Sequence, residues 1–102
     1  MHYLISYDIE SDRLRGKIAK TLERHGCHRV QRSVFVAPAM ARRDWQAMLA
    51  DLRHLCRAGG GVSAADSVLL VPLDEEELPD ITVLGSNNVL PLLQGGVLKI
   101  ML

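Results

Sequence analysis

The sequence predicts an α+β fold in which one antiparallel sheet carries two helices on the same face. The chain has 102 residues, of which 48% are hydrophobic and 24% charged, so we expect a single folded domain. Two segments have the apolar spacing of amphipathic helices, and short segments rich in β-branched and aromatic residues flank them. Helices set among short strands in one small domain favour a two-layer arrangement.

The first strand and the first helix have clear local signals. Residues 2–9 are rich in Tyr, Ile and Leu and are predicted to form a strand. Ser11 and Asp12 supply a helix cap and an acidic first turn, and Gly26 ends the helix. An apolar residue recurs every four positions and forms the buried stripe of this helix: Leu14, Ile18 and Leu22.

The remaining elements follow in the second and third quarters of the chain. Residues 28–37 are predicted to form a strand that Pro38 ends. Apolar spacing predicts a second amphipathic helix over residues 42–57. The apolar run Val68–Val71 is typical of a central strand, and Ile81–Leu84 is predicted as a short edge strand.

Two helices set among four strands resemble the ferredoxin-like βαββαβ sandwich, which we expect over residues 1–84. Both helices then cover one sheet face, and the other face needs a cover because strands that are apolar on both faces are seldom left in water. A homodimer that pairs the two open faces is the simplest cover. The apolar tail, residues 85–102, is expected to add a strand to a sheet or to dock a partner by strand addition.

Charge is unevenly distributed along the chain although the formal net charge is zero. Residues 1–57 hold eleven Lys and Arg against six Asp and Glu, whereas residues 58–102 hold one against six. This asymmetry predicts a basic working surface in the first half. Cys27 and Cys56 form no disulfide framework, no secretory signal is visible, and no apolar run approaches the roughly 20 residues that span a bilayer. We therefore expect a cytoplasmic protein with no membrane partner.

Basic residues line up on both predicted helices with few acids between them. Cations on the first helix fall at spacings of four, three and four, so they project from one side: Arg13, Lys17, Lys20 and Arg24. On the second helix the residues that line up in the same way are Arg42, Gln46, Arg53 and Arg57. Two such ridges suit a duplex backbone, with contacts that are independent of sequence and sensitive to salt. The alternative is a pair of solvated helix faces.

Asp8 ends the first strand and is the candidate metal ligand and catalytic residue. A strand-end acid can hold a divalent metal through oxygen, and flanking arginines can hold a phosphodiester. The arginines expected near Asp8 are Arg15, Arg29 and Arg32. In a twofold dimer, two Asp8 carboxylates with Mg²⁺ or Mn²⁺ between them could polarise a phosphoryl oxygen. The alternatives are a turn role for Asp8, ion pairs for the arginines, and a structural role for Phe35 at the dimer interface in place of base stacking.

The ordered set Tyr7-Asp8-Ile9, Arg15, Lys17, Leu22, Gly26 and Arg29-Val30-Gln31-x-Ser33-Val34-Phe35 resembles the signature of the second CRISPR-associated protein family, the small partner of the spacer integrase. The resemblance is close over residues 3–36 and continues by pattern to residue 84. It implies a ferredoxin-like subunit that forms a symmetric dimer, bridges two integrase dimers and holds a short DNA duplex during spacer capture. Some relatives are described as metal-dependent nucleases, with the acid that matches Asp8 as metal ligand.

The leading hypothesis is therefore a DNA-binding adaptor of CRISPR adaptation with metal-dependent endonuclease activity at Asp8. A second hypothesis is a freestanding toxin-type endoribonuclease of the same fold, which would act on single-stranded RNA. A third is a ferredoxin-like regulatory module that binds a small ligand, which the sequence signature disfavours.

Overall fold

A computed structural model describes residues 1–57, 63–82 and 84 of the chain. The predicted ferredoxin-like order, βαββαβ, is confirmed and is followed by a short 3₁₀ helix. The elements are β1 (His2–Asp8), α1 (Asp12–Arg24), β2 (His28–Gln31), β3 (Val34–Ala37), α2 (Arg42–Arg57), β4 (Ser67–Leu73) and η1 (Glu75–Asp80).

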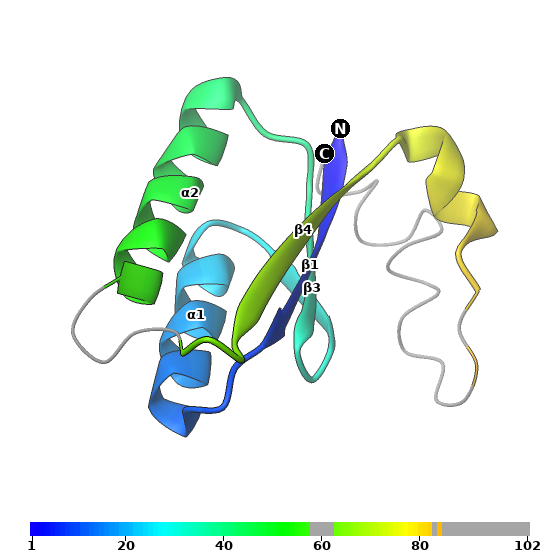
Figure 1. Cartoon of the computed structure of the whole chain (residues 1–102). Coiled ribbons are helices and arrows are strands. Elements are labelled where there is room, and N and C mark those ends of the chain that lie inside the picture. Colours follow the sequence, from blue (N-terminus) through cyan, green and yellow to red (C-terminus); the bar gives the residue numbers. More distant parts are fainter. Residues whose placement is uncertain (58–62, 83, 85–102) are drawn as a thin grey trace.

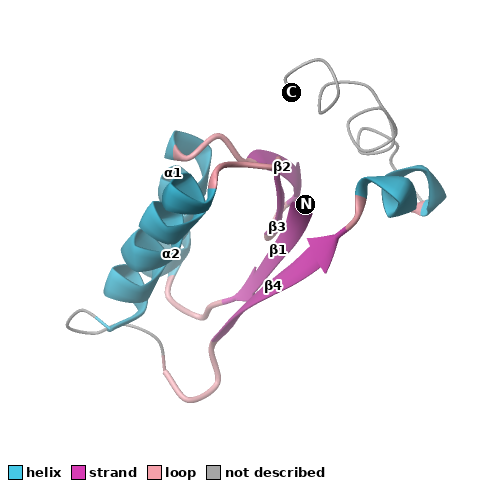
Figure 2. Cartoon of the chain, turned by 90° about the horizontal axis from the view of Figure 1, so that it is seen from above, coloured by secondary structure: helices cyan, strands magenta, loops and turns pink. Residues whose placement is uncertain are grey.

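The four strands form one antiparallel sheet in the order β2-β3-β1-β4. The central strand β1 pairs with both neighbours, so that Ile5 stands opposite Phe35 on one side and Leu70 on the other. Helices α1 and α2 run antiparallel along one face of this sheet, and η1 lies on the other side (Figures 1 and 2).

The main core fills the space between the sheet and the two helices. Alternate residues of β1 enter it, because successive strand side chains point to opposite faces. Phe35 lies in this core with no exposed surface, so the expectation that it packs at a dimer interface is wrong. The large side chains of the main core come from both the sheet and the helices: Ile5, Tyr7, Ile18, Leu22, Phe35, Met48 and Leu52.

Helix α1 begins and ends where its sequence predicts. The Ser11 hydroxyl accepts a hydrogen bond from the Leu14 N–H at 3.2 Å, which satisfies one of the free donors of the first turn. At the other end Gly26 adopts φ 86°, and the Cys27 N–H donates to the Leu22 carbonyl at 3.0 Å. This left-handed stop returns the chain to the sheet as β2.

Two predictions about the strands are wrong. The single strand expected over residues 28–37 is a hairpin, because Gln31 pairs with Val34 and the polar pair Arg32-Ser33 forms the turn. The edge strand expected at Ile81–Leu84 is not formed by its described residues 81, 82 and 84. The acidic segment before it forms η1 instead, and Pro79 within η1 has no N–H to offer a sheet.

The sheet face opposite the helices is apolar and partly covered. Val36 is fully buried there and packs with Leu4, Val30 and Ile81. Leu69, which stands beside Ser6 in the sheet, keeps 60% of its surface exposed on this face. The predicted apolar tail, residues 85–102, lies outside the described residues.

None of the helices in the described ranges is both long enough and apolar enough to cross a membrane.

Candidate nucleic-acid interface

A shallow groove with a volume of about 320 Å³ lies between α1 and α2. Three of the four α1 cations predicted to share a face contribute to its wall, and α2 supplies the opposite wall. The lining residues are Lys17, Lys20, Thr21, Arg24, Asp51, His54 and Leu55.

A second shallow hollow of about 480 Å³ continues this surface along the C-terminal half of α2. It is lined by Ala50, Arg53, His54 and Arg57, so His54 is common to both hollows. We call the combined surface the helix groove and define it by five exposed cations: Lys17, Lys20, Arg24, Arg53 and Arg57.

The other two cations predicted on these helices lie elsewhere. Arg13 is exposed on the first turn of α1 and lines neither hollow. Arg42 is the first residue of α2, eleven positions before Arg53, which corresponds to about 16 Å along the helix axis. The predicted α2 ridge is therefore split between the two ends of that helix.

Asp51 introduces a negative charge into the helix groove, which the charge pattern of the separate helices did not reveal. Its Oδ2 atom lies 2.8 Å from His25 Nε2 and 3.6 Å from Arg24 Nη2. The hydrogen bond from His25 is the main reason why the pKa of Asp51 is lowered, and the charges of His25 and Arg24 add to it. Arg24 is thus partly engaged within the protein, whereas no acid in the described part of the chain pairs with Lys17 or Lys20.

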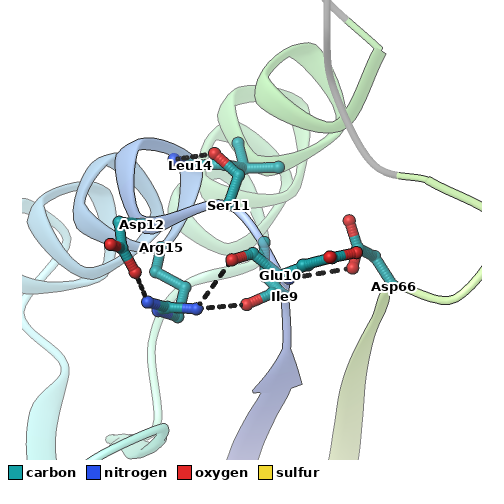
Figure 3. A network of polar contacts seen from close by, with 7 residues as sticks. All are labelled: Ile9, Glu10, Ser11, Asp12, Leu14, Arg15 and Asp66. Carbon is teal, nitrogen blue, oxygen red and sulfur yellow. Dashed lines mark hydrogen bonds and ion pairs between the residues drawn. The ribbon is translucent and has the colours of Figure 1, made fainter.

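Arg15 holds the turn that joins β1 to α1 (Figure 3). Its Nη1 atom donates to the carbonyl oxygens of Ile9 at 2.7 Å and Glu10 at 3.0 Å, and its Nη2 atom pairs with Asp12. The ion pair with Asp12 matches the alternative in which this arginine pairs with an acid. The Arg15 contacts also fix the chain direction immediately after Asp8.

Asp66 ties the same turn to the loop before β4 (Figure 3). Its two carboxylate oxygens accept hydrogen bonds from the Ser63 N–H and the Glu10 N–H, each at 2.9 Å. Those bonds, first from Ser63 and then from Glu10, lower the pKa of Asp66 because they stabilise the charged form. The sequence offered no sign of this contact, because 56 residues separate Glu10 from Asp66.

Asp8 is exposed at the end of β1, opposite Ser67 of β4. Because Tyr7 enters the helix-side core, Asp8 lies on the opposite, open face of the sheet. Within residues 1–57, 63–82 and 84, no three His, Cys, Asp or Glu side chains form a group that could hold a metal ion. Asp8 therefore belongs to no such three-residue group within these ranges.

The other two arginines expected near Asp8 lie in β2 and in the β2–β3 turn. Arg29 stands beside Phe35 in the sheet, with its guanidinium carbon 5.0 Å from the centre of the Phe35 ring, so it lies on the helix side. Arg32 is exposed in the β2–β3 turn. The Tyr7 N–H donates to the Ser33 carbonyl at 3.0 Å, which brings that turn beside the end of β1.

The fold and the site together define a small ferredoxin-like α+β protein with a basic groove between its helices and an exposed acid at a strand end. The family model described as CRISPR associated protein Cas2 matches residues 1–81. The chain therefore belongs to the Cas2 family, and the resemblance seen in the sequence is confirmed.

Two relatives named "CRISPR-associated endoribonuclease Cas2 2" support this assignment. The relative from Synechocystis is 33% identical over 87 residues, which cover 85% of this chain and 87% of that protein. The relative from Pyrobaculum aerophilum is 47% identical over 36 residues, which cover 35% of this chain and 40% of that protein.

Two solved structures share the fold. A hypothetical protein from Thermus thermophilus, TT1823, superposes with a TM-score of 0.63 at 29% identity and covers 83% of this chain and 90% of that one. Cas2 from Streptococcus pyogenes superposes with a TM-score of 0.66 at 21% identity and covers 83% of this chain and all of that one.

Proposed function

We propose that this Cas2-family protein acts in CRISPR adaptation as a homodimer that holds duplex DNA on its helix groove and bridges integrase dimers. The observation that carries the proposal is the convergence of five exposed cations from two helices on one surface. Phosphate groups bound there would replace condensed counterions, and such contacts carry no sequence information.

The spacing of the cations suits a nucleic-acid backbone. Lys17 and Arg24 lie seven positions apart on α1, which corresponds to about 10 Å along the helix. Successive phosphates of one DNA strand are about 3.4 Å apart along the duplex axis, so this distance corresponds to about three nucleotides. A surface that binds any sequence is what the capture of DNA fragments of arbitrary sequence requires.

The salt dependence of duplex binding tests this proposal. We expect the double variant Lys17→Gln, Lys20→Gln to bind a blunt 20-base-pair duplex more weakly at low salt, and the slope of log K against log salt concentration to fall by about 2. Fluorescence anisotropy of a labelled duplex measures both quantities. Arg43→Gln removes an exposed cation that lines neither hollow and should leave the slope nearly unchanged. An unaltered slope in the double variant would mean that Lys17 and Lys20 do not contact the duplex, which would contradict the proposed role of the helix groove.

The names of the two relatives favour a second candidate function, a freestanding endoribonuclease that cuts single-stranded RNA. In either function the proposed catalytic residue is Asp8, paired with its symmetry mate across the open sheet face. The pair would hold Mg²⁺ or Mn²⁺, and the ion would polarise a phosphoryl oxygen. This proposal is supported by the exposure of Asp8 at the strand end and by its place on the face that a dimer would cover.

Substitution of Asp8 separates cleavage from binding. We expect Asp8→Asn to abolish Mg²⁺-dependent cleavage of single-stranded RNA or duplex DNA while duplex affinity changes by less than about twofold, since Asp8 lies on the sheet face opposite the helix groove. Gel assays with both substrates, with and without EDTA, measure the cleavage. Equal cleavage by the variant and the natural chain would assign the activity to another site.

A further inference from the structure

A third hollow, with a volume of about 240 Å³, lies at the start of α2 and is separate from the helix groove. Two methionines, two aromatic rings and one arginine line it, and none of its lining residues carries a negative charge. We call it the aromatic pocket and define it by Met1, Tyr3, Met40, Arg42 and Trp45.

The two rings of the aromatic pocket form a stacked pair. Their centroids are 4.0 Å apart and their planes differ by 16°. Both rings are half-buried and pack against the main core, so the fold fixes their orientation before any ligand arrives. A pre-ordered aromatic surface loses little conformational entropy on binding, which favours a flat ligand.

The cationic side of the pocket is available for an anion. Arg42 is exposed, and no acid in the described ranges pairs with it. The first hydrogen bond of α2 runs from the Trp45 N–H to the Ala41 carbonyl at 3.0 Å, and Ala41 has no side-chain oxygen to cap the helix. The backbone N–H groups of this first turn lie beside Arg42, and Asp44 is an acid in the same turn.

We propose that the aromatic pocket binds one unpaired nucleobase of a single-stranded DNA end, with the base stacked on the Tyr3–Trp45 pair and its phosphate bound by Arg42. An apolar planar surface beside a cation matches a base and its phosphate, and bases inside a duplex have no free face to offer. This inference rests on the proposed function and deepens it. A duplex held by Arg53 and Arg57 at one end of α2 would lie about 16 Å from the pocket at the other end, within reach of a short unpaired extension.

Trp45 is the single tryptophan of the chain, so intrinsic fluorescence reports directly on the pocket. We expect the ten-nucleotide oligothymidylate (dT)₁₀ to quench Trp45 emission saturably, because a stacked base contacts the indole. A blunt 20-base-pair duplex should bind without that quenching. Inorganic polyphosphate of equal charge carries no bases and should leave the emission unchanged, and equal quenching by polyphosphate would overturn the proposal.

Two exposed arginines provide a matched pair of variants. Arg42→Gln should raise the Kd for (dT)₁₀ about tenfold, as expected for loss of one charge-assisted hydrogen bond, and Arg43→Gln in the same helical turn should change it little. Equal effects of the two variants, or binding of (dT)₁₀ with unaltered emission, would contradict the aromatic pocket.

Failure of the pocket and failure of the duplex proposal give different results. Salt-sensitive duplex binding that depends on Lys17 and Lys20, without quenching by (dT)₁₀, would reject the pocket and retain the groove. Quenching that depends on Arg42, without duplex binding, would retain the pocket and reject the groove.

Discussion

Asp51 is an acid that lines the helix groove among its cations. It accepts a hydrogen bond from His25 and pairs with Arg24, so it draws one of the five groove cations into the protein's own network. Lys17 and Lys20 are left as the α1 cations of the groove with no acid partner in the described residues. This is why the charge variants that test duplex binding are placed at those two lysines.

The lowered pKa of Asp51 predicts a pH-dependent contribution to stability. Because its pKa is lower in the folded chain than the ordinary value of 3.8, this contribution is complete above that value and is lost as the pH falls through the folded pKa. We expect Asp51→Asn to lower the urea midpoint at pH 7 and to lower it less as the pH falls below 3.8. Circular dichroism during urea titration measures this difference. An equal loss at pH 7 and below pH 3.8 would mean that Asp51 acts without its charge.

At the level of single residues, local periodicity predicts which helix cations share a face but not the contacts that tertiary packing creates. Lys17, Lys20 and Arg24 share a face because helical spacing alone places them there. Asp51 joins them only because α2 packs beside α1, and no spacing within either helix shows this. Arg15 is conspicuous as a cation, but its role in the turn depends on the carbonyl groups of Ile9 and Glu10, which any residue type would supply.

At the scale of elements, α1 is the part of the fold that its own sequence specifies best. Ser11 caps it, three apolar residues form its buried stripe, and Gly26 ends it in a conformation that disfavours a Cβ atom. The β2–β3 hairpin was missed because its turn, Arg32-Ser33, lacks the Asn-Gly or Asp-Gly pair that usually marks two-residue turns. The sequence does not predict the 3₁₀ helix η1, because a run of acidic residues such as Glu75-Glu76-Glu77 is equally typical of a solvent-exposed turn.

Substitution by alanine is expected to have opposite effects at Gly16, within α1, and at Gly26, just after α1. Gly26→Ala should destabilise the protein by about 1–2 kcal/mol, because alanine is strained at a positive φ. Gly16→Ala lies inside α1, where an added Cβ meets no atom within 4 Å, and should stabilise it by about 1 kcal/mol through helix propensity. Urea unfolding of both variants measures the two changes. The same sign for both would refute this account of how α1 ends.

At the scale of the whole molecule, the fold class could be predicted from two amphipathic helices set among short strands, whereas the cover of the open sheet face could not. Val36 is buried there with Leu4, Val30 and Ile81, so residues that follow β4 cover part of this face. Leu69 remains 60% exposed at the part of the sheet nearer Asp8. A twofold contact through Leu69 would bury this apolar surface and bring the two Asp8 carboxylates toward each other.

Sedimentation velocity at low ionic strength, with and without a blunt 20-base-pair duplex, tests whether this protein is a duplex-binding dimer. We expect a dimer that co-sediments with the duplex and is released as salt is raised. Leu69→Glu should sediment as a folded monomer, because the twofold contact would bury its charged side chain. A natural chain that sediments as a monomer and leaves the duplex boundary unchanged would contradict the account.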